Sequence, residues 1–158
     1  MPDADGGASE TRDGDSARSP TAVPVRPARS PDEPALRELQ ALLPEPSPGL
    51  LSYGLSTGTV LVTTAGAGRL VGYLLATHGD DTHLAELVVA PAYRREGRAS
   101  ALLSALLARR PDGERVTLAV AADSEPARSL YREFGFERVG SSETLFDDGT
   151  ALLLERPV

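Results

Sequence analysis

Residues 82–108 read THLAELVVAPAYRREGRASALLSALLA. Thr82 to Ala90 form a largely apolar run that is typical of a buried strand, and Pro91 ends it. A short basic loop with Gly97 follows, and leucines at helical spacing then predict a helix over residues 97–109. Because the first N–H groups of a helix lack partners and carry partial positive charge, such a unit can bind a pyrophosphate. Taken alone, the loop is more typical of an ordinary connection with solvated arginines than of a phosphate site. The rest of the sequence has to distinguish these two interpretations.

The composition of the 158-residue chain indicates one domain with an aliphatic core. Hydrophobic residues make up 41% of the chain, aromatic residues only 4%, and Trp is absent. No apolar segment reaches the roughly 18 residues that a membrane helix needs, and the start of the chain lacks the apolar part of a secretory signal. Cys is absent and there are two His, so neither disulfides nor a metal site is expected. We therefore expect a cytoplasmic protein with no membrane partner.

The charge of the chain argues against a nucleic-acid partner. The formal net charge is −7 and the sequence pI is about 4.8, which does not favour a broad basic surface. All 16 basic residues are Arg, and Asn is also absent. GC-rich coding explains this bias best, and adaptation to high salt is the alternative.

The order of predicted elements indicates a mixed α/β or α+β domain around one sheet. Residues 1–21 are rich in Asp, Gly, Ser, Ala and Pro, and we expect this acidic low-complexity tail to be disordered. Residues 22–158 then form the domain. Strands are predicted at residues 23–28, 59–64, 69–77, 82–90, 115–121, 136–140 and 150–155.

Two further helices are predicted besides residues 97–109. The first starts with Ser30 as N-cap and directs Leu36, Leu39, Leu42 and Leu43 inward. The second starts at Ser124, ends at Gly135, and directs Ala127, Leu130, Tyr131 and Phe134 inward. Between the first helix and the second strand, residues 44–58 are predicted to be a loop with about one helical turn.

Two blocks of the sequence resemble the GNAT family of N-acetyltransferases. Arg94-Arg95-Glu96-Gly97-Arg98-Ala99 fits the family's loop of Arg or Gln, two residues, Gly, one residue, then Gly or Ala. Residues 123–131 (DSEPARSLY), followed by Phe134-Gly135-Phe136, resemble the family's later segment. The resemblance covers roughly residues 23–156. It implies a GNAT fold, a central, mostly antiparallel twisted sheet with flanking helices, which binds acetyl-CoA at the splay after the fourth strand.

The resemblance also implies roles for individual residues. The backbone of Leu87, Val88 and Val89 would hold the acetyl and pantetheine parts, and the Tyr131 phenol would protonate the leaving thiolate or hold it by a hydrogen bond. Ser124 stands where many relatives have Asn, so its contact with the pantetheine arm is in doubt. The backbone N–H groups of Arg95, Glu96, Gly97, Arg98, Ala99 and Ser100 would cradle the pyrophosphate, and Arg94 would add positive charge.

The general base is left open between two residues. His83 lies eleven residues before Arg94, near an offset at which some family members place a catalytic Glu or His, and its ordinary pKa suits the task. Glu86 is the second candidate. Strand alternation would put it on the opposite face from His83 unless a bulge intervenes, and pairing with an Arg is its alternative role. His78 is expected to be a polar residue near a turn.

The function implied is transfer of the acetyl group of acetyl-CoA to a primary amine by direct attack in a ternary complex. The acceptor would be a small-molecule amine or a protein amine, and a homodimer is left open. A protein N-terminal acetyltransferase of the ribosomal-protein type is one alternative, although the Glu that such relatives often carry on the fifth strand is replaced by Ala119. A non-catalytic acyl-CoA-binding module is the other.

Overall fold

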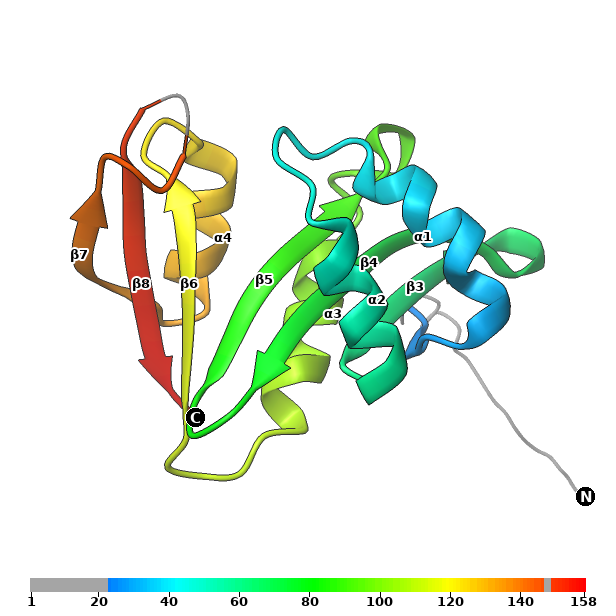
Figure 1. The fold of residues 1–158 in the computed structure, drawn as a ribbon, viewed down its shortest axis with the longest axis horizontal. Coiled ribbons are helices and arrows are strands. Elements are labelled where there is room, and N and C mark those ends of the chain that lie inside the picture. Colours follow the sequence, from blue (N-terminus) through cyan, green and yellow to red (C-terminus); the bar gives the residue numbers. More distant parts are fainter. Residues whose placement is uncertain (1–22, 147–148) are drawn as a thin grey trace, which may run out of the picture.

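The computed structural model describes residues 23–146 and 149–158, which form one seven-stranded sheet with helices on both faces (Figure 1). The expected disorder of residues 1–21 lies outside the described residues. The helices are α1 (Glu33–Gln40), α2 (Pro48–Thr57), α3 (Arg98–Ala108) and α4 (Glu125–Glu133). The strands are β2 (Val25–Pro27), β3 (Val60–Ala65), β4 (Arg69–His78), β5 (Thr82–Val89), β6 (Arg115–Ala121), β7 (Glu137–Ser142) and β8 (Ala151–Pro157). No helix of the described part is long and apolar enough to cross a bilayer.

The sheet has the order β2-β3-β4-β5-β6-β8-β7, and every neighbouring pair except one is antiparallel. The exception is the parallel pair of β5 and β6, which are in register only at Thr82 with Val116 and at His83 with Thr117. Beyond these residues the two strands diverge and form a fork, which opens upward in Figure 1. The mostly antiparallel sheet is therefore confirmed, and the splay follows the fourth strand of the predicted order, β5.

Each face of the sheet carries its own hydrophobic core. Leucines of α3 and the aromatic residues Tyr131 and Phe136 pack on one face, against β3, β4, β5, β6 and β8. Residues of α1 and α2, among them Leu36 and Leu51, pack on the other face of β3, β4 and β5. The predicted leucine stripe of α3 is confirmed, because Leu102, Leu103 and Leu106 are buried and Leu107 is half-buried.

The region between α1 and β3 differs from the prediction. Residues 48–57 form the ten-residue helix α2 rather than a single turn. Pro48 stands in its first turn, where a missing N–H costs nothing, and Gly58 ends it with a φ of 75°. Helix α1 ends at Gln40, so Leu42 lies beyond it and is 48% exposed rather than inward. The N-cap of α1 is Asp32, not Ser30, and Arg29 precedes the short 3-10 turn of residues 30–32 before the helix.

A β-bulge in β5 changes the faces that its side chains occupy. Leu75 of β4 pairs with Glu86, but Ala76 pairs with Leu84, so Ala85 is an extra residue. Leu84 packs on the α3 side, whereas Ala85 and Val88 pack on the α1 side. Strand alternation alone would put Glu86 and His83 on opposite faces, but the bulge, an exception that the prediction allowed for, puts both on the α1 side.

Candidate functional site

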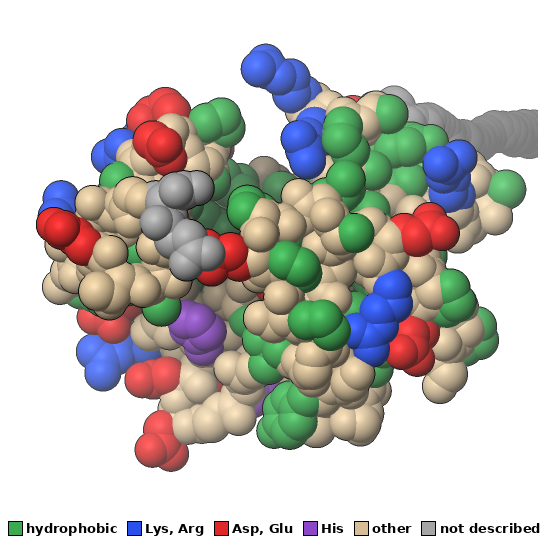
Figure 2. All heavy atoms as spheres, turned by 45° about the horizontal axis from the view of Figure 1, so that its top comes forward, with side chains coloured by type: hydrophobic (Ala, Val, Ile, Leu, Met, Phe, Trp, Pro, Cys, Tyr) green, Lys and Arg blue, Asp and Glu red, His purple; other side chains and the backbone are tan. Residues whose placement is uncertain are grey.

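An open cleft of about 650 Å³ lies where β5 and β6 separate. One wall is the edge of β5 at Leu87, Val88 and Val89, which has no strand neighbour on the fork side. The loop before α3, together with the first turn of that helix, forms a second wall, and α4 forms the third. Figure 2 looks toward this end of the molecule and shows a hollow between its two halves, with hydrophobic side chains in its depth.

Backbone N–H groups at the start of α3 face this cleft. The first turn closes with the bond from the Ala101 N–H to the Gly97 carbonyl, so the N–H groups of Arg98, Ala99 and Ser100 have no acceptor within the helix. Gly97 is the N-cap with a φ of 79°, a left-handed conformation that Gly adopts without a steric penalty. Arg95 has a φ of 65°. The loop that carries these N–H groups thus has a strained backbone at Arg95.

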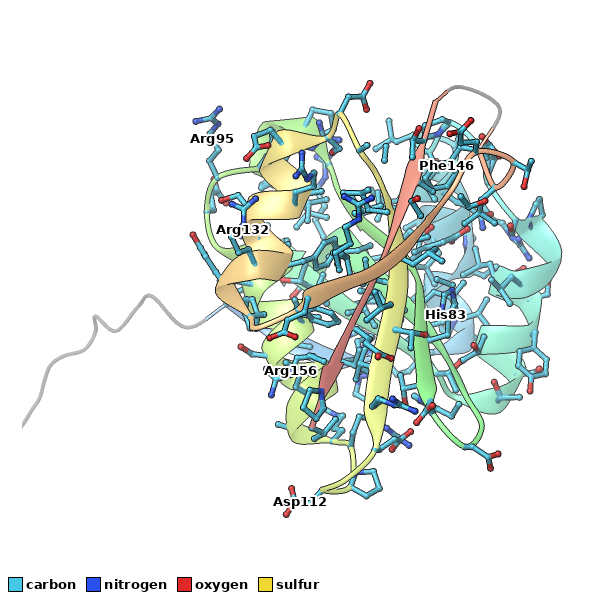
Figure 3. All side chains as sticks on the ribbon, turned by 90° about the vertical axis from the view of Figure 1, so that its left-hand side faces the viewer. His83, Arg95, Asp112, Arg132, Phe146 and Arg156 are labelled. Carbon is cyan, nitrogen blue, oxygen red and sulfur yellow. The ribbon has the colours of Figure 1, made fainter. Side chains whose placement is uncertain are left out.

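The three arginines of the loop have different roles in the structure. Arg94 donates from Nε to the Val89 carbonyl at 2.9 Å, and so ties the loop to the end of β5. Arg98 donates to the Thr64 carbonyl at 2.9 Å, pairs with Glu96 at 3.1 Å, and lies over the Tyr93 ring. Arg95 extends away from the loop into solvent (Figure 3). Of the three, Arg95 therefore has the side chain that can move to meet an anionic ligand.

Tyr131 forms part of the α4 wall and is only 8% exposed. Its ring packs edge to face on Phe136, with 5.6 Å between the ring centroids. Its hydroxyl has no hydrogen-bond partner among the described residues, which is uncommon for a buried tyrosine. Burial raises the pKa of Tyr131 to about 12. The site thus holds a protonated hydroxyl that is available to a ligand.

Two residues predicted to bind the cofactor lie outside the lining of the cleft. Ser124 is the N-cap of α4, and its side chain makes no capping hydrogen bond. Glu96 is turned toward Arg98. The other nine predicted cofactor residues line the cleft together: Leu87, Val88, Val89, Arg94, Arg95, Gly97, Arg98, Ala99 and Ser100.

His83 lies at the base of the fork, on the side of the strands away from α4 (Figure 3). Its Nδ1 is 2.9 Å from the Thr117 hydroxyl, across the last residue pair that joins β5 to β6. Partial burial lowers the pKa of His83 below its ordinary value. The imidazole is therefore neutral at pH 7, and its Nε2 is left for a second partner.

Glu86 is in a different environment, buried beneath α1 and 7% exposed. Its carboxylate accepts hydrogen bonds from the Tyr73 hydroxyl at 2.8 Å, from Gln40 Nε2 at 3.1 and 3.2 Å, and from the Ser47 N–H at 3.3 Å. Burial and the bond to Glu86 raise the pKa of Tyr73. The expected alternative partner, an Arg, is not among these donors. Three protein donors thus reach the carboxylate, and Gln40 Nε2 is shared between its two oxygens.

Several residues of the cleft were not identified from the sequence as site residues. Leu130 and Ala127 were predicted to be core residues of α4, because a stripe of apolar residues does not distinguish a protein core from a cleft wall. The position of Leu42 and Leu43 at the cleft depends on the path of the chain between α1 and α2. The residues missed in this way are Leu42, Leu43, Tyr93, Pro126, Ala127 and Leu130.

Both the sequence and the fold of the chain are similar to those of known proteins. The profile of the acetyltransferase (GNAT) family matches residues 26–136. A mycothiol acetyltransferase of Clavibacter michiganensis is 38% identical over 89 residues, which are 56% of this chain but 29% of that protein. The chain thus spans less than a third of the length of that relative.

Solved structures with similar folds have low sequence identity. Naa50 of Arabidopsis thaliana, in complex with a bisubstrate analogue, superposes with a TM-score of 0.78 at 18% identity, covering 86% of this chain and 99% of Naa50. A phosphinothricin acetyltransferase of Sinorhizobium meliloti in complex with acetyl-CoA gives a TM-score of 0.70 at 21% identity, covering 86% and 88% of the two chains. At these identities the likeness establishes the fold.

Proposed function

Because this chain belongs to the GNAT family of acetyltransferases, we propose that it transfers the acetyl group of acetyl-CoA to a primary amine by direct attack in a ternary complex. The family uses acetyl-CoA as cosubstrate and acylates amine acceptors, either small molecules or proteins. The observation that carries the proposal is the buried Tyr131 hydroxyl, which is unpartnered among the described residues and borders the cleft at the open edge of β5.

The residues of the cleft fit the chemical parts of acetyl-CoA. The free N–H groups of Arg98, Ala99 and Ser100 suit the pyrophosphate, and Arg95 adds a mobile positive charge. The open edge of β5 can hydrogen-bond the amide groups of the pantetheine arm, while the apolar wall of α4 covers it. Ser124 and Glu96 are left out of this assignment.

In the transfer step the amine nitrogen attacks the thioester carbonyl carbon and the carbon–sulfur bond breaks. The leaving thiolate takes a proton from the Tyr131 hydroxyl, whose raised pKa keeps it protonated until that moment. The amine gives up one proton to a general base. We assign that role to His83, directly or through a water, because its imidazole is neutral and one ring nitrogen is free of the Thr117 contact.

The identity of the acceptor distinguishes this proposal from the protein N-terminal acetyltransferase. Ala119 follows Thr117 by two residues in β6, on the same face as His83, and offers no carboxylate to a protein N-terminus. A small primary amine is therefore our first choice, and a protein N-terminal acetyltransferase is the second. We also propose that the protein is cytoplasmic. The tail over residues 1–21 is proposed to be dispensable for acetyl-CoA binding.

An acceptor screen with the purified full chain tests the proposal. Release of free CoA from acetyl-CoA is measured with small amines, amino acids and short peptides that carry free N-termini, at low and at molar salt. Turnover with small amines supports the first choice, and turnover confined to peptides supports the N-terminal enzyme. Acetyl-CoA binding without turnover on any acceptor would identify a non-catalytic module, and no binding at all would contradict every form of the proposal.

A further inference from the structure

The carboxylate of Glu86 joins three separate segments of the chain. Gln40 is the last residue of α1, Ser47 is the N-cap of α2, and Tyr73 lies in the middle of β4. Each of them donates a hydrogen bond to Glu86, and Gln40 also donates to the Ser47 carbonyl at 3.0 Å. Both ends of the connection between α1 and α2, residues 41–47, are thus held by one side chain of β5.

This connection has little internal structure of its own. It contains Pro44 and Pro46, which lack the N–H groups that could build helix or strand hydrogen bonds within it. An exposed second tie joins the same two helices, because Arg37 donates to the Pro48 carbonyl at 2.9 Å and to the Ser52 hydroxyl at 2.7 Å. The buried tie is the stronger of the two, since solvent does not compete for the Glu86 carboxylate.

The connection also carries part of the cleft. Leu42 and Leu43 line it together with the edge of β5 that starts at Leu87, the residue after Glu86. A shift of the connection therefore changes the shape of the cleft. Three protein donors already bind the Glu86 carboxylate, which leaves about one of its four lone-pair positions for another donor. Glu86 also lies beneath α1 and not in the lining of the cleft, so it is not placed to take a proton from an amine bound there.

We propose that Glu86 is a positioning residue that fixes the α1–α2 connection against β5 and so holds Leu42 and Leu43 at the wall of the cleft. Its effect on turnover rests on the proposed function, whereas its effect on the connection does not. Loss of the tie loosens residues 41–47 and weakens acetyl-CoA binding, while the proton transfer itself is unaffected.

Two substitutions remove the tie from opposite ends. Glu86→Gln replaces the acceptor, and Gln40→Ala removes one donor while the carboxylate stays in place. Glu38→Gln makes the same chemical change as the first variant on the exposed side of α1 and is the matched control. Thermal melting shows whether each variant is folded, and if Glu86→Gln does not fold, Gln40→Ala decides the test.

Hydrogen exchange of the peptide that spans residues 41–47, and the Kd of acetyl-CoA by calorimetry, are measured in all variants. A hydrogen bond to a charged group corresponds to a factor of roughly ten in these equilibria. We expect faster exchange and a Kd raised about tenfold in both Glu86→Gln and Gln40→Ala, with no change in Glu38→Gln. Unchanged exchange and Kd in the two variants would overturn the proposal.

The pH profile of kcat separates positioning from proton transfer. If Glu86 positions the connection, both variants keep the acidic limb of the wild-type profile. A loss of that limb in Glu86→Gln alone, with kcat lowered at least about 100-fold, would make Glu86 the base and refute the proposal. If the acceptor screen finds no turnover at all, the proposed function fails, but the exchange and Kd measurements still test the role of Glu86.

Discussion

Replacing Tyr131 by Phe should make the protein more stable and less active at once. The hydroxyl is buried, with the side chain 8% exposed, and it has no partner among the described residues. A buried polar group without a hydrogen bond costs about 1–3 kcal/mol, so removing the oxygen should recover about 1 kcal/mol. For a chain of this length that corresponds to a Tm about 2–4 °C higher. Loss of the general acid should lower kcat by at least about 100-fold.

Thermal melting and CoA-release kinetics on the same preparation measure both effects. Tyr73→Phe is the matched control, because its hydroxyl donates to Glu86 at 2.8 Å and its loss should lower the Tm. Since the pKa of Tyr131 is about 12, the wild-type kcat should show no alkaline decline from this group below pH about 11. A Tm lowered in Tyr131→Phe would show that the hydroxyl has a partner in the protein. An unchanged kcat would refute its role as the acid.

Three further changes test other parts of the structure. His83→Gln keeps a polar contact with Thr117 but should abolish the acidic limb of the pH profile of kcat/KM. In the wild type this limb lies below pH about 6.5, because burial lowers the pKa of His83. A limb that persists in the variant would exclude His83 as the base. Arg95→Gly should raise the Tm in thermal melting, because it relieves about 1 kcal/mol of strain at a left-handed residue. The same change should raise the Kd of acetyl-CoA in calorimetry, because it removes a positive charge from the loop. Gly54→Ala should lower the free energy of unfolding by about 1–3 kcal/mol in denaturant titration, since the new Cβ would lie 2.4 Å from Leu75 Cδ1.

The parts of the fold that follow local rules could be predicted from the sequence. An apolar run indicates β5, Gly97 indicates the loop, and leucine spacing indicates α3. Arg115 to Ala121 form a strand with the predicted bounds. Helix α2 was missed because PGLLSYGLST contains two Gly and is weakly amphipathic, so the prolines before it suggested a loop. Its helical state depends on Leu51, which is fully buried against the sheet.

The faces of β5 could not be predicted, because a bulge is set by pairing with a neighbouring strand and not by the strand itself. Ala85 carries no local signal of being an extra residue, yet it decides that Glu86 lies beside Tyr73. The same limit applies to Gln40, which meets Glu86 across 46 positions of sequence. The loop donors could be predicted from a local motif, whereas the polar contacts beneath α1 required the tertiary structure.

The fork between β5 and β6 has a mechanical consequence. Within the described part of the chain, two β5–β6 residue pairs join the strands on one side of it to those on the other, and both pairs lie at the same end of the sheet. Polar side chains reinforce this seam, through Thr82 with Glu114 at 2.7 Å and His83 with Thr117 at 2.9 Å. The two halves of the sheet are therefore paired at one end and separate toward the other. A force that separates the open ends of β5 and β6 is resisted by the paired end, where His83 lies, and by the hydrophobic core that the two halves share. Any molecule that contacts both halves adds to this resistance.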